Sequence, residues 1–281
     1  MRIAVIGSTG MFGSDLLSVL NANGIDCQGF NRQSLDFEQS PQSLTEIFKD
    51  FDSVVNAVAF TAVDKAETEI YEANTVNGIY AGVLARASKI AGAKFIHIST
   101  DYVFDGLSST PYKVDEVTNP QTAYGKSKAL GEQLVTESGA DYSILRAAWL
   151  YGDSGRCFPK VMAELLRKNG SVRVVSDQFG QPTWTHDLAE IVIQVLNLNQ
   201  MPRIVHAVSS GKASWSDFAK EVAKSIGITD EAVEGISTAE YPTPAKRPAW
   251  SVLDNSSDVI TPIGDWRERW RVAAPEVLRG I

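Results

Sequence analysis

The sequence predicts an α/β fold: a doubly wound parallel sheet followed by a smaller C-terminal part. Three observations predict it. Short apolar runs alternate with helical patterns over the first half, a glycine-rich loop follows the first run, and the pattern becomes less regular after Trp149. Such an alternation builds a parallel sheet with right-handed crossovers, which binds ligands at the carboxyl ends of its strands.

Four apolar runs have the length and composition of buried parallel strands, and a fifth is weaker. The four runs lie at residues 3–7, 53–59, 94–100 and 142–149, and the weaker one at 26–32. Helical patterns at 11–24 and 77–92 each end at a glycine, as helices commonly do. A further helix begins near Tyr124, and others are expected at 158–166 and 215–226.

These patterns divide the chain into two parts. We expect a nucleotide-binding domain over residues 1–150, with residues 187–208 returning to its sheet. Residues 151–281 are expected to form mainly a substrate-binding part above the strand ends.

Composition narrows the class of protein and its location. A formal net charge of −8 disfavours a nucleic-acid binder, since phosphate binding needs a basic face. Cys27 and Cys157 have no metal-like or redox-like spacing, which favours free thiols in a reducing compartment. The first residues read as a strand rather than a signal peptide, and no apolar stretch is long enough to span a membrane. We therefore expect a cytoplasmic protein.

The loop GSTGMFG, which contains Gly7, Thr9, Gly10 and Gly13, follows the first strand and opens a helix. Glycines there allow a tight turn, close approach of the backbone to a pyrophosphate, and close packing of helix on strand. The N-terminus of the helix offers unpaired N–H groups to phosphates. The loop therefore predicts a dinucleotide in a Rossmann-type domain rather than a merely structural turn.

The end of the second strand indicates which dinucleotide is bound. It lacks the acidic residue that binds a ribose 2′-hydroxyl, and Arg32 stands there instead. Because an arginine can accommodate a 2′-phosphate, NADPH is favoured and NADH remains possible. The alternative is that Arg32 is a solvated residue after a strand.

Tyr124 and Lys128 are four positions apart in the sequence, so they lie on one helix face. A phenol can protonate a ketone oxygen as hydride reaches the carbon. An ammonium about 4 Å away would favour the phenolate by roughly 4 kcal/mol at an effective dielectric constant of about 20. Thr100, at the end of a strand, can hold the substrate oxygen. The alternative is an ordinary helix start with a packed tyrosine and a solvated lysine.

Six motifs extend over nearly the whole chain: NAVAFTAVDKAE, STDYVFDG, AYGKSK, RAAWLYG, DQFGQPTW and YPTPAKRP. Together they resemble the dTDP-4-dehydrorhamnose reductases, which are extended short-chain dehydrogenase/reductases. The resemblance implies reduction of the C4 ketone of a dTDP-4-keto-6-deoxy-hexose, giving dTDP-L-rhamnose, with NADPH or NADH.

The resemblance also implies roles for individual residues. Tyr124 is the proton donor with Lys128 as its partner, Thr100 and Asp101 contact the sugar, and Trp149 lines the sugar pocket. The residues at the family's cofactor positions, beside the glycines, are Met11, Phe12, Asp36, Phe37, Ala59, Phe60 and Thr61.

Several of these residues have a second interpretation. Asp101 can tune the proton supply or cap a helix, and Trp149 can present an apolar face to a deoxysugar or belong to the core. Lys246 and Arg247 can bind the diphosphate or remain solvated.

No metal site is predicted, since His97, His186 and His206 lack metal-ligand spacing. Asp187 and Glu190 can hold Mg²⁺ at the contact of a possible homodimer, or simply lie on an exposed helix face.

Three rival functions remain. A 4,6-dehydratase of similar sequence places a glutamate after the Thr-Asp pair, where this chain has Tyr102, and this disfavours dehydration. A 4-epimerase would show no net consumption of its cofactor. A non-catalytic NADP-binding regulatory subunit would bind a partner enzyme without turnover.

Overall fold

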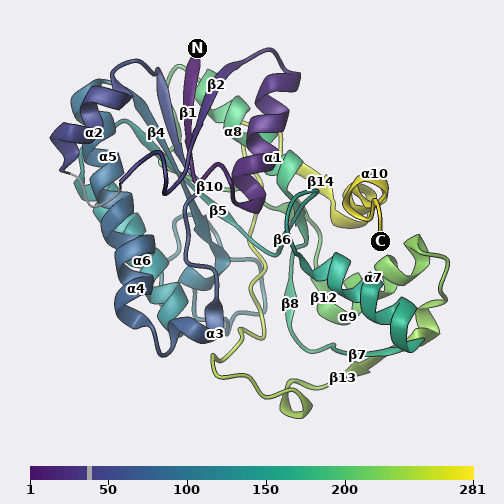
Figure 1. Cartoon of the computed structure of the whole chain (residues 1–281). Coiled ribbons are helices and arrows are strands. Elements are labelled where there is room, and N and C mark those ends of the chain that lie inside the picture. The colour runs from purple at the N-terminus through teal and green to yellow at the C-terminus, as the bar shows by residue number, and fades with distance from the viewer. Residues whose placement is uncertain (37–39) are drawn as a thin grey trace.

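The computed structural model describes residues 1–36 and 40–281, and in this part of the chain six parallel strands form the main sheet. Their order is β10-β5-β4-β3-β1-β2 (Figure 1). The strands are β1 (Arg2–Ile6), β2 (Asp26–Phe30), β3 (Ser53–Asn56), β4 (Lys94–Thr100), β5 (Tyr142–Ala147) and β10 (Ile204–His206). The predicted fold class is confirmed. The strand order reverses between β1 and β3, which makes this crevice the expected ligand position.

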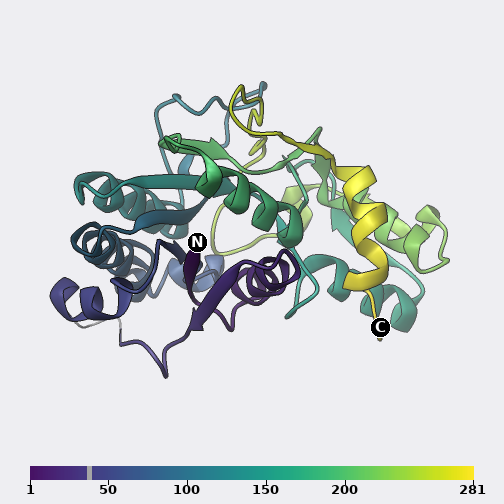
Figure 2. The same ribbon diagram turned by 90° about the horizontal axis from the view of Figure 1, so that it is seen from above.

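Helices cover both faces of the sheet (Figures 1 and 2). On one face α1 (Met11–Ala22) packs against α8 (Thr185–Asn197), and together they bury an aliphatic core. The other face carries α2 (Pro41–Phe48), α5 (Tyr80–Ala91) and α6 (Ala123–Glu137) over a second core that includes Phe48 and Phe95. Apolar residues buried on both faces explain why the strands read as continuous apolar runs.

Two predicted strands end earlier than expected. β3 stops at Asn56, whose side-chain Oδ1 accepts a hydrogen bond from the Val58 backbone N–H at 3.1 Å and turns the chain out of the sheet. β5 stops at Ala147, because Trp149 adopts a positive φ of 45° that no regular strand permits.

Two short helices that were not predicted precede α5, together with a π-helical turn that overlaps the start of the predicted helix at 77–92. They are α3 (Val63–Ala66), α4 (Ile70–Asn74) and the turn Thr75–Ile79. A π-turn is rare and is frequently found at functional sites.

The remaining elements form a smaller C-terminal part beside the sheet (Figure 2). Its helices are α7 (Phe158–Asn169), α9 (Trp215–Ser225) and α10 (Trp266–Val277). Paired short strands join them: β6 (Leu150–Tyr151) with β9 (Thr183–Trp184), β7 (Val172–Val175) with β13 (Val233–Ile236), β8 (Phe179–Gly180) with β12 (Ala213–Ser214), and β11 (Ser209–Ser210) with β14 (Ile263–Asp265). The sequence patterns anticipated α7 and α9 but not α10.

The chain crosses between the two parts more than once. After α7 it returns to the main sheet, where α8 packs on α1 and β10 pairs in parallel with β5. Across the described ranges, no helix combines the length and the apolar character that a membrane crossing requires.

Candidate active site

The glycine loop lies at the carboxyl end of β1, where the strand order reverses. Gly7 has a φ of 89°, and a Cβ there would lie 2.9 Å from the Val58 backbone nitrogen. A Cβ on Gly13 would overlap the Gly7 carbonyl oxygen. Both positions therefore require glycine, one for its backbone conformation and both for space.

A cavity of about 360 Å³ opens beside this loop. It is lined by Gly7, Thr9, Gly10, Asn31, Arg32, Gln33, Ala57, Val58 and Ala59, from the ends of β1, β2 and β3. No side chain among the described residues caps the N-terminus of α1, so its first N–H groups are free to bind phosphate. These residues fit a dinucleotide.

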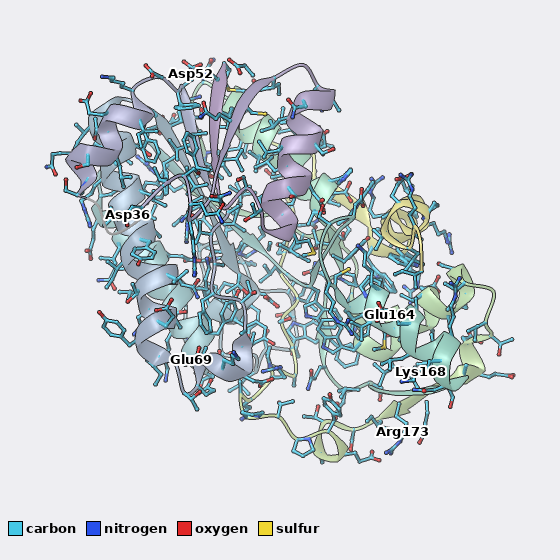
Figure 3. All side chains as sticks on the ribbon, viewed as in Figure 1. Asp36, Asp52, Glu69, Glu164, Lys168 and Arg173 are labelled. Carbon is cyan, nitrogen blue, oxygen red and sulfur yellow. The ribbon has the colours of Figure 1, made fainter. Side chains whose placement is uncertain are left out.

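The other expected cofactor residues lie in different surroundings. Phe12 is buried in the core under α1, so only its backbone can reach the cavity. Phe60 packs against the same small apolar cluster as Tyr124, and neither Phe60 nor Thr61 is among the described residues that line the cavity. Asp36 is exposed on the side of the sheet covered by α2 and α5 (Figure 3). Met11 is half-buried against the C-terminal core, and Phe37 lies outside the described residues.

Tyr124 and Lys128 lie one turn apart on α6, which Thr122 caps by accepting the Gly125 N–H at 3.0 Å. Lys128 is only 1% exposed, and its Nζ donates to the Ile98 carbonyl at 2.6 Å. Burial lowers the pKa of Lys128 to about 8, although the charge of Glu132 acts in the opposite direction.

The phenol of Tyr124 is protonated at neutral pH. Burial raises its pKa to about 12, although the Thr100 hydroxyl acts to lower it. Because the Lys128 ammonium is bonded to the backbone of β4, burial rather than this charge sets the pKa of Tyr124 in the structure. A protonated phenol is the form that a proton donor needs.

Thr100 is the last residue of β4 and Asp101 follows it, and both are buried. The Thr100 hydroxyl accepts from the Tyr102 N–H at 3.2 Å and donates to Asp101 Oδ1 at 2.8 Å. Thr100, and not Asp101, therefore caps the turn Asp101–Val103.

Asp101 Oδ2 is buried without a hydrogen-bond partner among the described residues, since the nearby Ser251 hydroxyl donates to the Phe179 carbonyl. Burial raises the pKa of Asp101 to about 6, with the Ser251 and Thr100 hydroxyls acting in the opposite direction. An unpartnered buried carboxylate oxygen is costly unless a ligand uses it.

A second cavity, of about 310 Å³, begins at Tyr102, whose ring meets that of Tyr124 edge-on at 5.6 Å. Lys246 and Arg247 contribute to its wall. Arg247 is not simply solvated, because its Nη2 donates to Asp64 Oδ2 at 2.8 Å. The full lining is Tyr102, Phe104, Asp105, Gly106, Leu107, Gln121, Thr122, Asp177, Thr238, Lys246, Arg247, Pro248 and Ala249.

Trp149 lies between the two parts of the chain. Its indole stacks on Trp215, with ring centroids 3.6 Å apart and planes 7° from parallel. A Cβ on Gly180 would lie 2.5 Å from its Cε2, so the Gly180 backbone also packs against the ring. The tryptophan thus belongs to two apolar clusters, and the stacked face is covered.

The sequence interpretation missed a buried ion pair behind the site. Glu132 accepts hydrogen bonds from Arg146 at 2.9 and 2.8 Å and from the Ser99 hydroxyl at 2.6 Å. The sequence contained a sign of this pair, because Glu132 is four residues after Lys128 and so continues the same helix face. Asn77 was missed too: its side chain bonds both the N–H and the carbonyl of Phe60, at 2.7 and 3.1 Å.

The acidic and histidine residues considered for a metal have other partners. Asp187 is buried against Arg269 through bonds of 2.7 and 2.9 Å, which contradicts both a free ligand and an exposed helix face; Glu190 is exposed. His97 bonds Asn56, His186 bonds Asp153, and His206 lies against Arg146. Within residues 1–36 and 40–281, no three histidine, cysteine or acidic side chains are grouped to hold a metal.

Comparison with known proteins places this geometry in a family. Residues 1–280 match the family model described as RmlD substrate binding domain. The spore coat polysaccharide biosynthesis protein SpsK of Bacillus subtilis is 38% identical over 280 residues, covering 99% of this chain and 97% of that protein. A probable dTDP-4,6-dihydroxy-2-methyloxan-3-one 4-ketoreductase of Streptomyces antibioticus is also 38% identical, covering 99% and 96%.

A solved structure is similar along its whole length. It is the dTDP-4-dehydrorhamnose reductase of Bacillus anthracis in complex with NADP. It is 31% identical, with a TM-score of 0.92 over 98% of this chain and 99% of that chain.

The fold, the cavity at the glycine loop and these matches together define an NAD(P)-dependent reductase of the nucleotide-sugar class. The matches extend along nearly the whole chain in each case. The chain belongs to the RmlD substrate-binding domain family of nucleotide-sugar reductases.

Proposed function

We propose that this chain reduces the C4 ketone of a dTDP-4-keto-6-deoxy-hexose, converting dTDP-4-dehydrorhamnose to dTDP-L-rhamnose with NADPH. The observation that carries the proposal is the α6 face, where the protonated Tyr124 phenol lies one turn from the buried Lys128. Similarity to a reductase solved with NADP supports the choice of cofactor and substrate.

Each polar residue has a separate task in this reaction. NADPH, whose diphosphate the glycine loop and the N-terminus of α1 would hold, would supply the hydride. Tyr124 donates its proton to the ketone oxygen, and Thr100 orients that oxygen. The phenolate left on Tyr124 lies within one helical turn of the Lys128 ammonium, whose positive charge stabilises it. Asp101 Oδ2, buried and unpartnered, accepts a sugar hydroxyl.

Trp149 and Arg247 complete the proposed substrate contacts. Because Trp215 covers one face of Trp149, the sugar contacts the exposed remainder of the indole. Arg247, with Lys246, binds the diphosphate from the wall of the second cavity. On the cofactor side, Arg32 binds the 2′-phosphate that distinguishes NADPH from NADH.

The residue after Asp101 favours reduction over dehydration. A dehydratase needs a carboxylic acid there to protonate a leaving hydroxyl. Tyr102 occupies the position, and burial raises the pKa of its phenol well above the usual range. So weak an acid is poorly suited to this task.

The test is NADPH consumption by the purified chain, with dTDP-4-dehydrorhamnose supplied and the product sugar identified by NMR. We expect Tyr124→Phe to lower kcat by about 100-fold or more with the dissociation constant for NADPH nearly unchanged. Tyr102→Phe, which removes the neighbouring phenol, should cost much less. Absence of turnover in the wild type would favour the regulatory subunit, and similar losses in both variants would reject Tyr124 as the donor.

A further inference from the structure

Asp64 joins the cofactor side of the molecule to the C-terminal loop that borders the second cavity. Its Oδ2 accepts from Arg247 Nη2 at 2.8 Å, and its Oδ1 accepts from the Ala245 N–H at 3.1 Å. These contacts join residues more than 180 positions apart in the chain. In Figure 1 the yellow-green segment that follows β13 passes beside α3, the helix that carries Asp64.

In the sequence, Asp64 comes only a few residues after the segment that lines the cofactor cavity. Ala59 lines that cavity, and α3 begins at Val63. The short connection is held firmly, because the Asn77 side chain bonds both backbone groups of Phe60. The end of α3 is fixed as well, since Glu67 Oε1 accepts the Ala123 N–H at the start of α6 at 2.9 Å. The Ala57–Ala59 wall of the cavity is therefore joined to Asp64 by a short connection that is anchored at Phe60 and at Glu67.

The ion pair between Asp64 and Arg247 is suited to exchange, in which Arg247 also binds another anion, rather than to a permanent bridge. The Arg247 and Asp64 side chains are 21% and 41% exposed, and ion pairs this accessible to water add little stability. Partial burial acts to raise the pKa of Asp64, yet the hydrogen bonds from Arg247 and Ala245 hold it below the usual value. Asp64 is therefore charged at neutral pH. Arg247 Nη1 also bonds the Ala245 carbonyl at 3.3 Å, and the guanidinium has further N–H donors for an anion.

We propose that Asp64 is a positioning residue that couples the binding of the dinucleotide to the binding of the substrate's nucleoside diphosphate. A cofactor bound against Ala57–Ala59 acts on Asp64 through this rigid connection, and Asp64 holds Ala245 and Arg247 at the rim of the second cavity. Arg247 is thereby pre-oriented for the diphosphate, so less free energy is spent in ordering the loop when substrate binds. The proposal rests on the proposed function, because it takes the second cavity as the nucleotide-sugar site.

The test measures the coupling itself by calorimetry on the full chain, with dTDP as the probe. We expect dTDP to bind about tenfold more tightly in the presence of saturating NADP⁺ than in its absence. In Asp64→Asn this ratio should fall to nearly one, while the affinity for NADP⁺ alone stays within about twofold of the wild type. Because linkage is reciprocal, dTDP should improve NADP⁺ binding by the same factor in the wild type and not in the variant.

Glu72→Gln is the control, because it removes an exposed carboxylate from the neighbouring helix α4. Its coupling ratio should equal that of the wild type. Steady-state kinetics give a second readout: Asp64→Asn should raise the KM for the nucleotide sugar with little change in kcat, whereas a general folding defect would lower kcat.

The outcomes separate the two proposals. If the wild type binds NADP⁺ and dTDP independently, or if Asp64→Asn keeps the wild-type ratio, the coupling is rejected and the proposed function stands. If the wild type binds no dTDP under either condition, both are rejected.

Discussion

The Glu132 carboxylate and the Arg146 guanidinium form a buried two-point ion pair, with Nε–Oε1 and Nη2–Oε2 distances of 2.9 and 2.8 Å. The pair joins α6 to β5 directly behind Lys128, and Ser99 of β4 completes it. The helix that carries the proposed proton donor is thus fixed to β4 and β5 by charge as well as by apolar packing.

Removing one member of this pair should destabilise the fold strongly. Glu132→Leu leaves the Arg146 charge buried without a partner, at a cost of about 3–5 kcal/mol in the free energy of unfolding. The double variant Glu132→Leu/Arg146→Leu should recover a large part of this loss. Urea unfolding of the wild type, both single variants and the double variant measures the coupling. Additive losses in the double variant would contradict the expectation.

The charge of Lys128 predicts how turnover depends on pH. Lys128 has a pKa of about 8, so the ammonium is present below that pH and is lost above it. If the charge stabilises the Tyr124 phenolate, kcat/KM should fall as pH rises through about 8. Glu132→Gln removes the charge that raises this pKa, and the fall should move to lower pH by about one unit. Glu137→Gln, an exposed site on the same helix, should leave the profile unchanged.

Asp101 should show a conflict between stability and activity. Its pKa is about 6 in the folded chain against an ordinary value of 3.8, so stability falls as pH rises through this interval. At pH 7 the buried charge costs up to about 3 kcal/mol. Asp101→Asn should therefore raise the Tm by several degrees at pH 7 and by less near pH 4, while turnover falls. A lower Tm at pH 7 would show that this carboxylate stabilises the fold.

Arg32 is expected to select the coenzyme. It lies exposed in the wall of the dinucleotide cavity, where a guanidinium can bind a 2′-phosphate. Arg32→Ala should weaken NADPH binding by about tenfold or more and NADH binding very little. Gln33→Ala, in the same wall, serves as the control. Fluorescence titration with NADPH and with NADH measures the two affinities. Equal losses of affinity for the two coenzymes would mean that Arg32 does not bind the 2′-phosphate.

A larger residue at position 180 should weaken binding of the nucleotide sugar and leave cofactor binding unchanged. An added Cβ lies 2.5 Å from Trp149 Cε2, and the Trp149–Trp215 stack leaves the indole little room to move away. Gly180→Ala should raise the KM for the nucleotide sugar several-fold with unchanged NADPH affinity. Gly264→Ala is the control, since its Cβ would find no atom nearer than 3.8 Å. Loss of both affinities together would indicate a broader structural change.

The fold class and the location of the site could be predicted because both depend on local patterns. Strands buried on both faces give continuous apolar runs, and a glycine loop after the first run marks the strand-end crevice. Tyr124, Lys128 and Glu132 are also local, since a single helix period places them on one face. The glutamate could have been found by extending that period one turn further.

Contacts between distant segments could not be predicted. Nothing near Asp64 indicates that its partner is Arg247, and nothing near Asp187 indicates Arg269. The same holds for Trp149, whose accessible surface depends on Trp215 and Gly180 from the C-terminal part. The raised pKa of Tyr124 likewise follows from burial in the complete fold, which neither the helix period nor the residue types reveal.

The return of α8 and β10 to the main sheet determines when this protein can fold during its synthesis. A nascent chain that has emerged only to residue 150 exposes the backbone edge of β5 that β10 later covers, and leaves the α1 side of the core without α8. An uncovered strand edge is prone to pair with other chains. The dinucleotide-binding half thus reaches its native form only after about three quarters of the chain has left the ribosome, so expressing it as a separate fragment should yield aggregate rather than a working module.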